Sequence, residues 1–156
     1  MLAELLFVFA SAFAGAMGFA LLLHAPKRSL APGSLIGALG YTAVWLLPRL
    51  GVSEALAMFA GAFLAAAAAQ LAARRLRMIS TIFITIAILP LVPGIGLYRA
   101  MSALGQGSTG QGALIAVQSM TLILMIALGV AIGSALFGAR GRPVPERSAS
   151  MPPPIA

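Results

Sequence analysis

The sequence predicts an all-α, polytopic membrane protein with five transmembrane helices, and its composition, its apolar runs and the placement of its basic residues all indicate this. Of 156 residues, 61% are hydrophobic and 8% are charged, and the mean hydropathy is +1.04. A soluble domain of this size needs far more polar residues to cover its surface. We therefore expect the chain to lie in a lipid bilayer. The lack of cysteine and the single histidine exclude a disulfide scaffold, a zinc cluster and a cysteine nucleophile.

Each predicted span is an apolar run of about 20 residues, the length that crosses a bilayer as a helix. Short connections join the runs, so neighbouring helices are expected to pack side by side and antiparallel. Together they form a membrane domain over residues 1–137. The five predicted spans are Leu2–Leu23, Gly33–Leu50, Glu54–Ala73, Ile79–Leu104 and Gln111–Phe137.

The first apolar run could be interpreted either as a transmembrane helix or as a signal peptide. A signal peptide begins with positive charge, yet Glu4 is the only charged residue before this apolar run, and Lys27 and Arg28 follow it. We therefore retain it as a transmembrane helix. His24 closes this span beside the basic pair and is expected to lie at the membrane interface rather than to relay protons.

Small residues recur at four-residue spacing along four of the spans. Such residues let helix backbones approach closely, so that van der Waals contact replaces the hydrophobic force that lipid cannot supply. We expect these faces to pack inside the bundle, with a membrane partner as the other possible neighbour. The residues are Ser11 and Gly15, Gly33 and Gly37, Ala57, Gly61, Ala65 and Ala69, and Gly129 and Gly133.

The fourth span, Ile79–Leu104, contains two prolines and two glycines in an otherwise apolar run. Proline lacks an N–H group and clashes with the carbonyl four residues earlier, so a helix should stop near Leu89 and restart near Pro93. At 1.5 Å per residue, Pro90 lies about 16 Å along the span, near the membrane midplane. Freed backbone groups at that depth need protein or a watery cavity. The break at Pro90–Gly94 therefore predicts a binding site or pathway, with a purely structural kink as the alternative.

The chain changes character after the fifth span. Residues 138–156 are rich in Arg, Ser and Pro, and they contain too little apolar material to order themselves. We expect a disordered, basic cytoplasmic tail.

Basic residues gather in alternate connections, eight on one side of the membrane and only Arg49 and Arg99 on the other. This bias predicts a multi-pass protein of the inner (plasma) membrane with its N-terminus outside and its C-terminus in the cytoplasm. It explains the net charge of +7 by topology and lipid contacts, and no nucleic-acid partner is expected. The eight are Lys27, Arg28, Arg74, Arg75, Arg77, Arg140, Arg142 and Arg147.

Two stretches carry a resemblance to a known family. The run Pro90–Met101 resembles the P-x-x-P-G-x-x-x-Y segment of the threonine/serine exporter family, in its C-terminal five-helix half. The Gly18-Phe19-Ala20 segment, with Pro26 closing the first span and the Gly-rich Gly33–Tyr41 opening the second, is similar to the beginning of that half. The resemblance covers about residues 2–137. Two features depart from the family pattern: Arg99, directly after Tyr98, and the basic, Pro-rich tail.

The resemblance implies a non-enzymatic membrane transport subunit that exports threonine- and serine-like amino acids or small dicarboxylates. We expect no cofactor and no metal. Family members occur as one chain with two membrane halves or as two subunits. The resemblance therefore implies a companion five-span subunit, which carries a hydrophilic extension that this chain lacks. No acidic residue lies in the membrane interior, because Glu4 and Glu54 stand at the ends of spans and Glu146 in the tail. We therefore also expect that partner to supply any titrating group for proton coupling.

We expect the substrate site at the break in the fourth span. The restarted helix presents free N–H groups and its positive dipole end near Gly94 and Gly96, which suits a substrate carboxylate. Arg99 either attracts anions at the mouth of this site or snorkels to the interface. Pro90, Pro93 and Gly94 would shape the site. Thr85 and Tyr98 would line it with their hydroxyl groups. The expected substrate-binding residues are Thr85, Pro90, Pro93, Gly94, Gly96, Tyr98 and Arg99.

Two other function classes are open to this sequence. A structural or assembly subunit of a membrane complex would use the same small-residue faces, and the lack of an intramembrane charge favours it. A membrane enzyme ranks third, because the chain offers no pair of acids, no histidine cluster and no nucleophile with a base.

Overall fold

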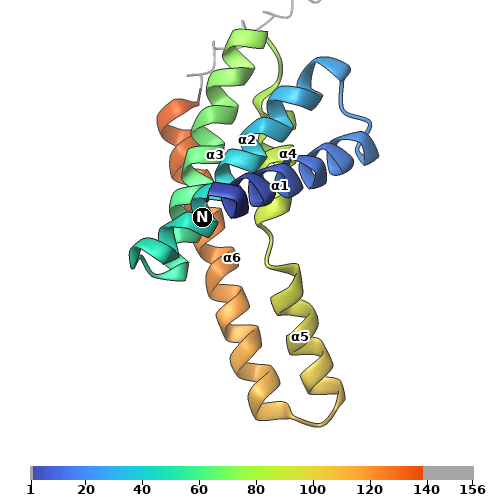
Figure 1. The fold of residues 1–156 in the computed structure, drawn as a ribbon, viewed down its shortest axis with the longest axis vertical. Coiled ribbons are helices and arrows are strands. Elements are labelled where there is room, and N and C mark those ends of the chain that lie inside the picture. Colours follow the sequence, from blue (N-terminus) through green and yellow to red (C-terminus); the bar gives the residue numbers. More distant parts are fainter. Residues whose placement is uncertain (1, 139–156) are drawn as a thin grey trace, which may run out of the picture.

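The computed structural model describes residues 2–138, and every regular element in that range is a helix (Figure 1). Within this range four helices are long and apolar enough to cross a membrane, and one bent pair passes the same test together, which gives up to five spans. The predicted five-span, all-α architecture is confirmed, whereas the predicted tail lies, apart from Gly138, outside the described residues. The elements are α1 (Leu2–Leu22), α2 (Lys27–Leu46), η1 (Leu47–Leu50), α3 (Glu54–Leu76), α4 (Ser80–Ile88), η2 (Leu89–Leu91), α5 (Gly94–Gly105) and α6 (Thr109–Phe137).

The fourth span is broken where its prolines predict. Helix α4 ends at Ile88, the single 3₁₀ turn η2 follows, and α5 begins at Gly94. Pro90 stands in the first turn of η2, where its missing N–H group is least costly. The two halves are bent by 51° against each other. Because that angle is far from a reversal, the chain runs on in the same general direction (Figure 1).

Helix α2 begins earlier than the predicted span, at Lys27 rather than Gly33. Pro32 therefore lies inside the helix, although proline removes one helical hydrogen bond. The first turn is held by Ser29, whose N–H group and hydroxyl each donate a hydrogen bond to the Pro26 carbonyl at 2.8 Å. Lys27, the first residue of α2, therefore belongs to the first helical turn and not to a connecting loop.

Small residues bring α2, α3 and α6 together. A Cβ atom on Gly129 would lie 2.5 Å from the Phe59 carbonyl oxygen, and one on Gly61 would lie 2.9 Å from the Gly40 carbonyl oxygen. Only glycine allows backbones this close. Gly133 likewise sits against Ala66. The predicted small-residue faces of α3 and α6 therefore pack inside the chain, and that of α2, formed by Gly33 and Gly37, does so against Ile86 of α4 and Ala16 of α1.

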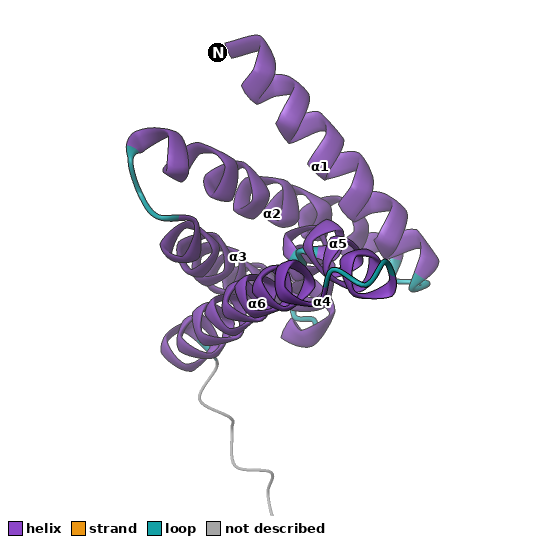
Figure 2. Cartoon of the chain, turned by 90° about the horizontal axis from the view of Figure 1, so that it is seen from below, coloured by secondary structure: helices purple, strands orange, loops and turns teal. Residues whose placement is uncertain are grey.

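The packing face of α1 differs from the predicted one. Ser11 and Gly15 are exposed, and Gly15 has open space around it. The buried residues are alanines, of which Ala16 and Ala20 pack against Ile86 of α4. The alanine methyl groups therefore form the contact with α4. The Ser11 hydroxyl instead donates a hydrogen bond to the Val8 carbonyl within its own helix, at 2.9 Å. Figure 2 shows α1 lying along one side of the molecule next to α2.

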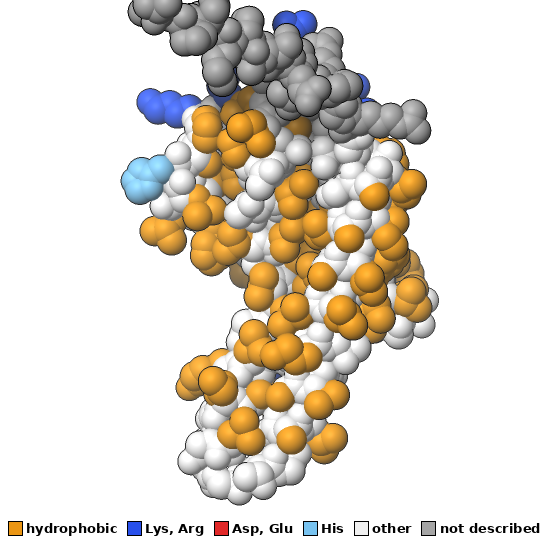
Figure 3. Space-filling model, turned by 180° about the vertical axis from the view of Figure 1, so that it is seen from behind, with side chains coloured by type: hydrophobic (Ala, Val, Ile, Leu, Met, Phe, Trp, Pro, Cys, Tyr) orange, Lys and Arg blue, Asp and Glu red, His pale blue; other side chains and the backbone are white. Residues whose placement is uncertain are grey.

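Apolar side chains are spread over the face drawn in Figure 3, and many large ones are exposed, as expected where lipid is the solvent. Helix α5 and the first half of α6 form a two-helix hairpin that extends beyond the other helices (Figure 1), and its helices approach where Leu104 packs on Gly112. On the face in Figure 3, the Lys and Arg side chains gather at the end opposite the hairpin. Exposed apolar residues include Leu6, Phe7, Leu22, Leu64, Leu114, Val117 and Leu124.

Candidate functional site

A pocket of about 360 Å³ lies where the fourth span breaks, between the start of α3, the first turns of α5 and the middle of α6. We call it the break pocket. Three residues predicted for the site, Pro93, Gly96 and Arg99, lie in its wall. The complete lining is Glu54, Met58, Pro93, Ile95, Gly96, Arg99, Ile115, Gln118, Ser119 and Leu122.

Leu91 anchors the break in the centre of the helices. Its side chain is 1% exposed and clusters with Val44, Ala62 and Ile126, which come from three other helices. From this fixed point the chain extends through Val92 and turns into α5. The start of α5 is therefore held at a set position beside α6.

The first turn of α5 supplies hydrogen-bond donors at the pocket. The first N–H groups of a helix have no acceptor within it, and those of Ile95 and Gly96 belong to this turn. Gly94 differs from the expectation, because its N–H group donates to the Val92 carbonyl at 2.8 Å. Arg99 lies one turn further along and lines the same pocket. This wall therefore carries positive charge and N–H donors.

Ser119 lies directly across from Gly96. A Cβ atom on Gly96 would be 2.6 Å from the Ser119 Oγ atom, so the pair fits only because residue 96 has no side chain. Ser119 is 3% exposed, and within residues 2–138 its hydroxyl has no hydrogen-bond partner. No fully enclosed side-chain oxygen or nitrogen in that range lacks a partner. The Ser119 hydroxyl therefore reaches the pocket.

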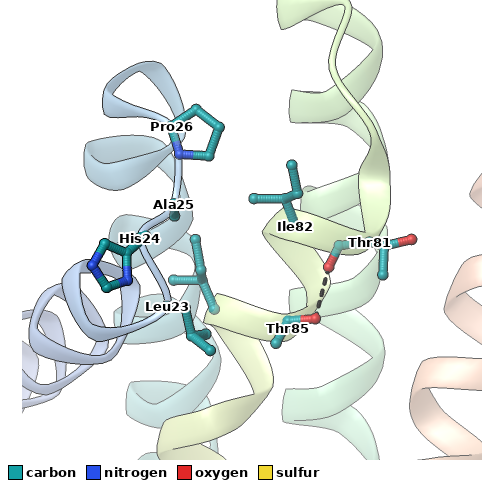
Figure 4. A pocket seen from close by; sticks show the side chains of 8 residues that line it. Leu23, His24, Ala25, Pro26, Thr81, Ile82 and Thr85 are labelled. Carbon is teal, nitrogen blue, oxygen red and sulfur yellow. Dashed lines mark hydrogen bonds between the residues drawn. The ribbon is translucent and has the colours of Figure 1, made fainter.

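Thr85 lies in a different pocket, of about 320 Å³, beside the turn between α1 and α2 (Figure 4). We call it the turn pocket. Thr85 donates a hydrogen bond to the Thr81 carbonyl at 2.9 Å, which satisfies its hydroxyl within α4. The structure does not bring Thr85 together with Arg99, because the break redirects the chain between them. The turn pocket is lined by Leu23, His24, Ala25, Pro26, Thr81, Ile82, Thr85 and Ile86.

Three more predicted residues lie near the break but outside the lining of the break pocket. Tyr98 is 73% exposed on α5. Gly94 is exposed, and a Cβ atom there would meet no atom within 4 Å. Pro90 is half-buried in η2. Pro90 and Gly94 therefore shape the path of the chain, and Pro93, Gly96 and Arg99 form the pocket surface.

Sequence reasoning missed Glu54 as a pocket residue. It was placed at the end of a span and given no role, yet its helix directs it to the same pocket as Arg99. One signal for this was present. Glu54 begins the third predicted span and Arg99 lies near the end of the fourth, so both charges fall on the same predicted side of the membrane.

One comparison with known proteins identifies the family. The family model described as threonine/serine exporter, ThrE, matches residues 8–136. The chain belongs to the threonine/serine exporter family. It is thus a multi-pass membrane protein of an exporter family of the threonine/serine type, and this transporter family is not an enzyme class. No curated protein and no solved structure matches the chain. All residues of the break pocket lie inside the matched range.

Proposed function

We propose that the chain is the five-span half of a threonine/serine exporter and that it binds its substrate in the break pocket. The observation that carries the proposal is the meeting of three polar features in one space: the first turn of α5, the Arg99 side chain and the unpartnered Ser119 hydroxyl. The volume lies in the range of about 300–1,000 Å³ that small-molecule sites occupy.

Each polar feature has a task in substrate binding. The N–H groups of Ile95 and Gly96, together with Arg99, bind the substrate carboxylate at the positive end of α5. Ser119 and the neighbouring Gln118 hydrogen-bond the substrate hydroxyl. A buried hydroxyl without a partner costs free energy, so a substrate that supplies the partner is favoured. Apolar residues close the remaining wall.

The two pockets mark a path along the fourth span. The turn pocket adjoins α4 and the break pocket adjoins α5, and Leu91 lies between them in the chain, buried among three other helices. Export requires this buried side chain to move so that the site opens first to one side and then to the other. In this proposal Thr85 lines the path that leads to the break pocket, and it does not contact the substrate bound in that pocket.

Deletion of the gene is expected to raise intracellular threonine and serine and to slow their efflux from preloaded cells, and a plasmid copy should restore efflux. Efflux of labelled threonine, serine and a small dicarboxylate from the same strains measures this. A structural or assembly subunit without its own path predicts another outcome: efflux that survives pocket substitutions as long as the chain is present in the membrane.

We further propose that a companion five-span subunit completes the exporter. Transporters of this kind build their midplane site at the junction of two related halves, and residues 2–138 of this chain contain up to five spans, enough for one half. Inverted halves need opposite orientations, whereas the charge bias of this chain favours one only. A second copy of the same chain therefore cannot supply the inverted half.

The orientation that we propose places the N-terminus outside and the C-terminus in the cytoplasm of the inner (plasma) membrane. Lys27 opens α2, and Arg74 and Arg75 close α3. Since these helices run antiparallel, the three basic residues lie at one end of the molecule. Positive charge is retained on the cytoplasmic side during insertion.

Reporter fusions test this orientation directly. Fusions after Arg28, Arg77 and Arg147 are expected to report a cytoplasmic position, and a fusion after Gly107 should report the outside. Paired reporters, one active only in the cytoplasm and one only outside, provide the control at every position. The inverse pattern would show that the charge argument is wrong.

A further inference from the structure

The break pocket contains one negative and one positive side chain from different helices. Glu54 is the first residue of α3, and Arg99 lies in the second turn of α5. Within residues 2–138 the two groups form no ion pair with each other or with another side chain. Both charges are therefore available to a bound molecule.

We propose that Glu54 binds the ammonium group of the substrate and thereby selects amino acids over dicarboxylates. This inference rests on the proposed function, because it concerns the same pocket. A zwitterionic amino acid has one positive and one negative group on the same carbon atom. Its carboxylate matches Arg99 and the α5 terminus, and its ammonium group matches Glu54. Each charge of the substrate then meets an opposite charge of the protein.

A dicarboxylate meets a different environment in this pocket. One of its carboxylates can occupy the place beside Arg99, but the second has no positive side chain left to bind among those that line the pocket. Glu54 repels that second carboxylate, and repulsion of the wrong ligand is an effective source of specificity. A hydroxy acid without an ammonium group avoids the repulsion but leaves Glu54 without a partner.

The position of Glu54 also has a structural explanation that the test must separate. An acidic residue in the first turn of a helix interacts favourably with the helix dipole, and Glu54 would do so in α3 without any substrate. Glu4 offers a matched control. It is likewise the acidic residue in the first turn of a spanning helix, α1, and it lines a different pocket with Trp45 and Arg49.

The test compares Glu54→Gln and Glu4→Gln in cells that express the complete exporter. Efflux of labelled threonine is measured with increasing amounts of three unlabelled internal competitors: threonine, 3-hydroxybutyrate, which lacks the ammonium group, and succinate. Membrane abundance of each variant is measured by immunoblot. In the parent, only threonine is expected to compete strongly.

Glu54→Gln is expected to raise the KM for threonine by about tenfold or more and to reduce the preference for threonine over 3-hydroxybutyrate by a similar factor. Glu4→Gln should leave both quantities as in the parent. An equal fall in transport of every compound, or unchanged selectivity in Glu54→Gln, would overturn the role of Glu54 while threonine efflux by the parent still supports the proposed function. A parent strain without threonine efflux overturns both.

A charge exchange gives a second, independent result. Glu54→Arg alone places two positive charges in the pocket and should abolish threonine efflux. Adding Arg99→Glu restores one charge of each sign on opposite helices. Efflux should then recover in part, at least about tenfold over the single variant, because a reversed substrate regains both charge pairs but loses the N–H groups of Ile95 and Gly96. If the double variant is no better than Glu54→Arg at equal abundance, the two charges do not act as a pair on the substrate.

Discussion

Replacing Gly96 with leucine is expected to lower threonine efflux by about a hundredfold or more. A Cβ atom at this position would lie 2.6 Å from the Ser119 Oγ atom, and we expect the remaining side-chain atoms to extend into the break pocket, which Gly96 lines. The substitution therefore displaces the Ser119 hydroxyl and fills the space for the substrate. Efflux from preloaded cells, normalised to the amount of the chain in the membrane, measures the effect.

Gly94→Leu provides the matched control, because Gly94 is two residues away on the same helix and has open space around it. This variant should export at nearly the parent rate. Gly96→Ala combined with Ser119→Ala removes the steric conflict and also the hydroxyl, and it should insert normally but bind threonine more weakly. Full export by Gly96→Leu would show that the substrate does not use the break pocket.

The purified chain, reconstituted alone into liposomes, is expected to show no threonine flux. The family resemblance implies two membrane halves, and the break pocket here is formed by three elements of one half only, the start of α3 with α5 and α6. The hairpin of α5 and α6 extends beyond the other helices, and many of its large apolar side chains are exposed, including Tyr98, Met101, Leu114 and Val117. The companion subunit is expected to complete the path beside this hairpin.

Co-reconstitution supplies the positive arm of that experiment. Liposomes containing both subunits should show threonine flux above those with either subunit alone, at equal protein and with the same lipid. The Gly96→Leu variant in the same pair serves as the negative control. Flux by the chain alone, sensitive to the Gly96 substitution, would refute the need for a partner.

The sequence predicted correctly those features that depend on a single segment of the chain. Proline loses its N–H group wherever it stands, so Pro90 and Pro93 predicted both ends of the break to within about one residue. Apolar length likewise predicted the spans, because crossing lipid depends on each segment by itself. The early start of α2 escaped prediction, since the hydrogen bonds of Ser29 to Pro26 hold its first turn despite Pro32.

The same reasoning explains why the pocket lining could be predicted only in part. Pro93 directly precedes α5, and Gly96 and Arg99 lie within that short helix, so their neighbourhood follows from local spacing. Glu54 and Ser119 come from helices far away in the sequence. No local pattern reports which of their faces turns toward α5.

The sequence by itself determined the membrane setting, the five spans, the charge bias and the place of the break, because each depends on backbone chemistry or on composition within one segment. Only the tertiary structure decided that Thr85 faces the turn pocket and that Glu54 joins Arg99 at the break pocket. The physical reason is that the 51° bend and the close contact of Gly96 with Ser119 depend on packing between helices, and a single segment cannot specify its own neighbours.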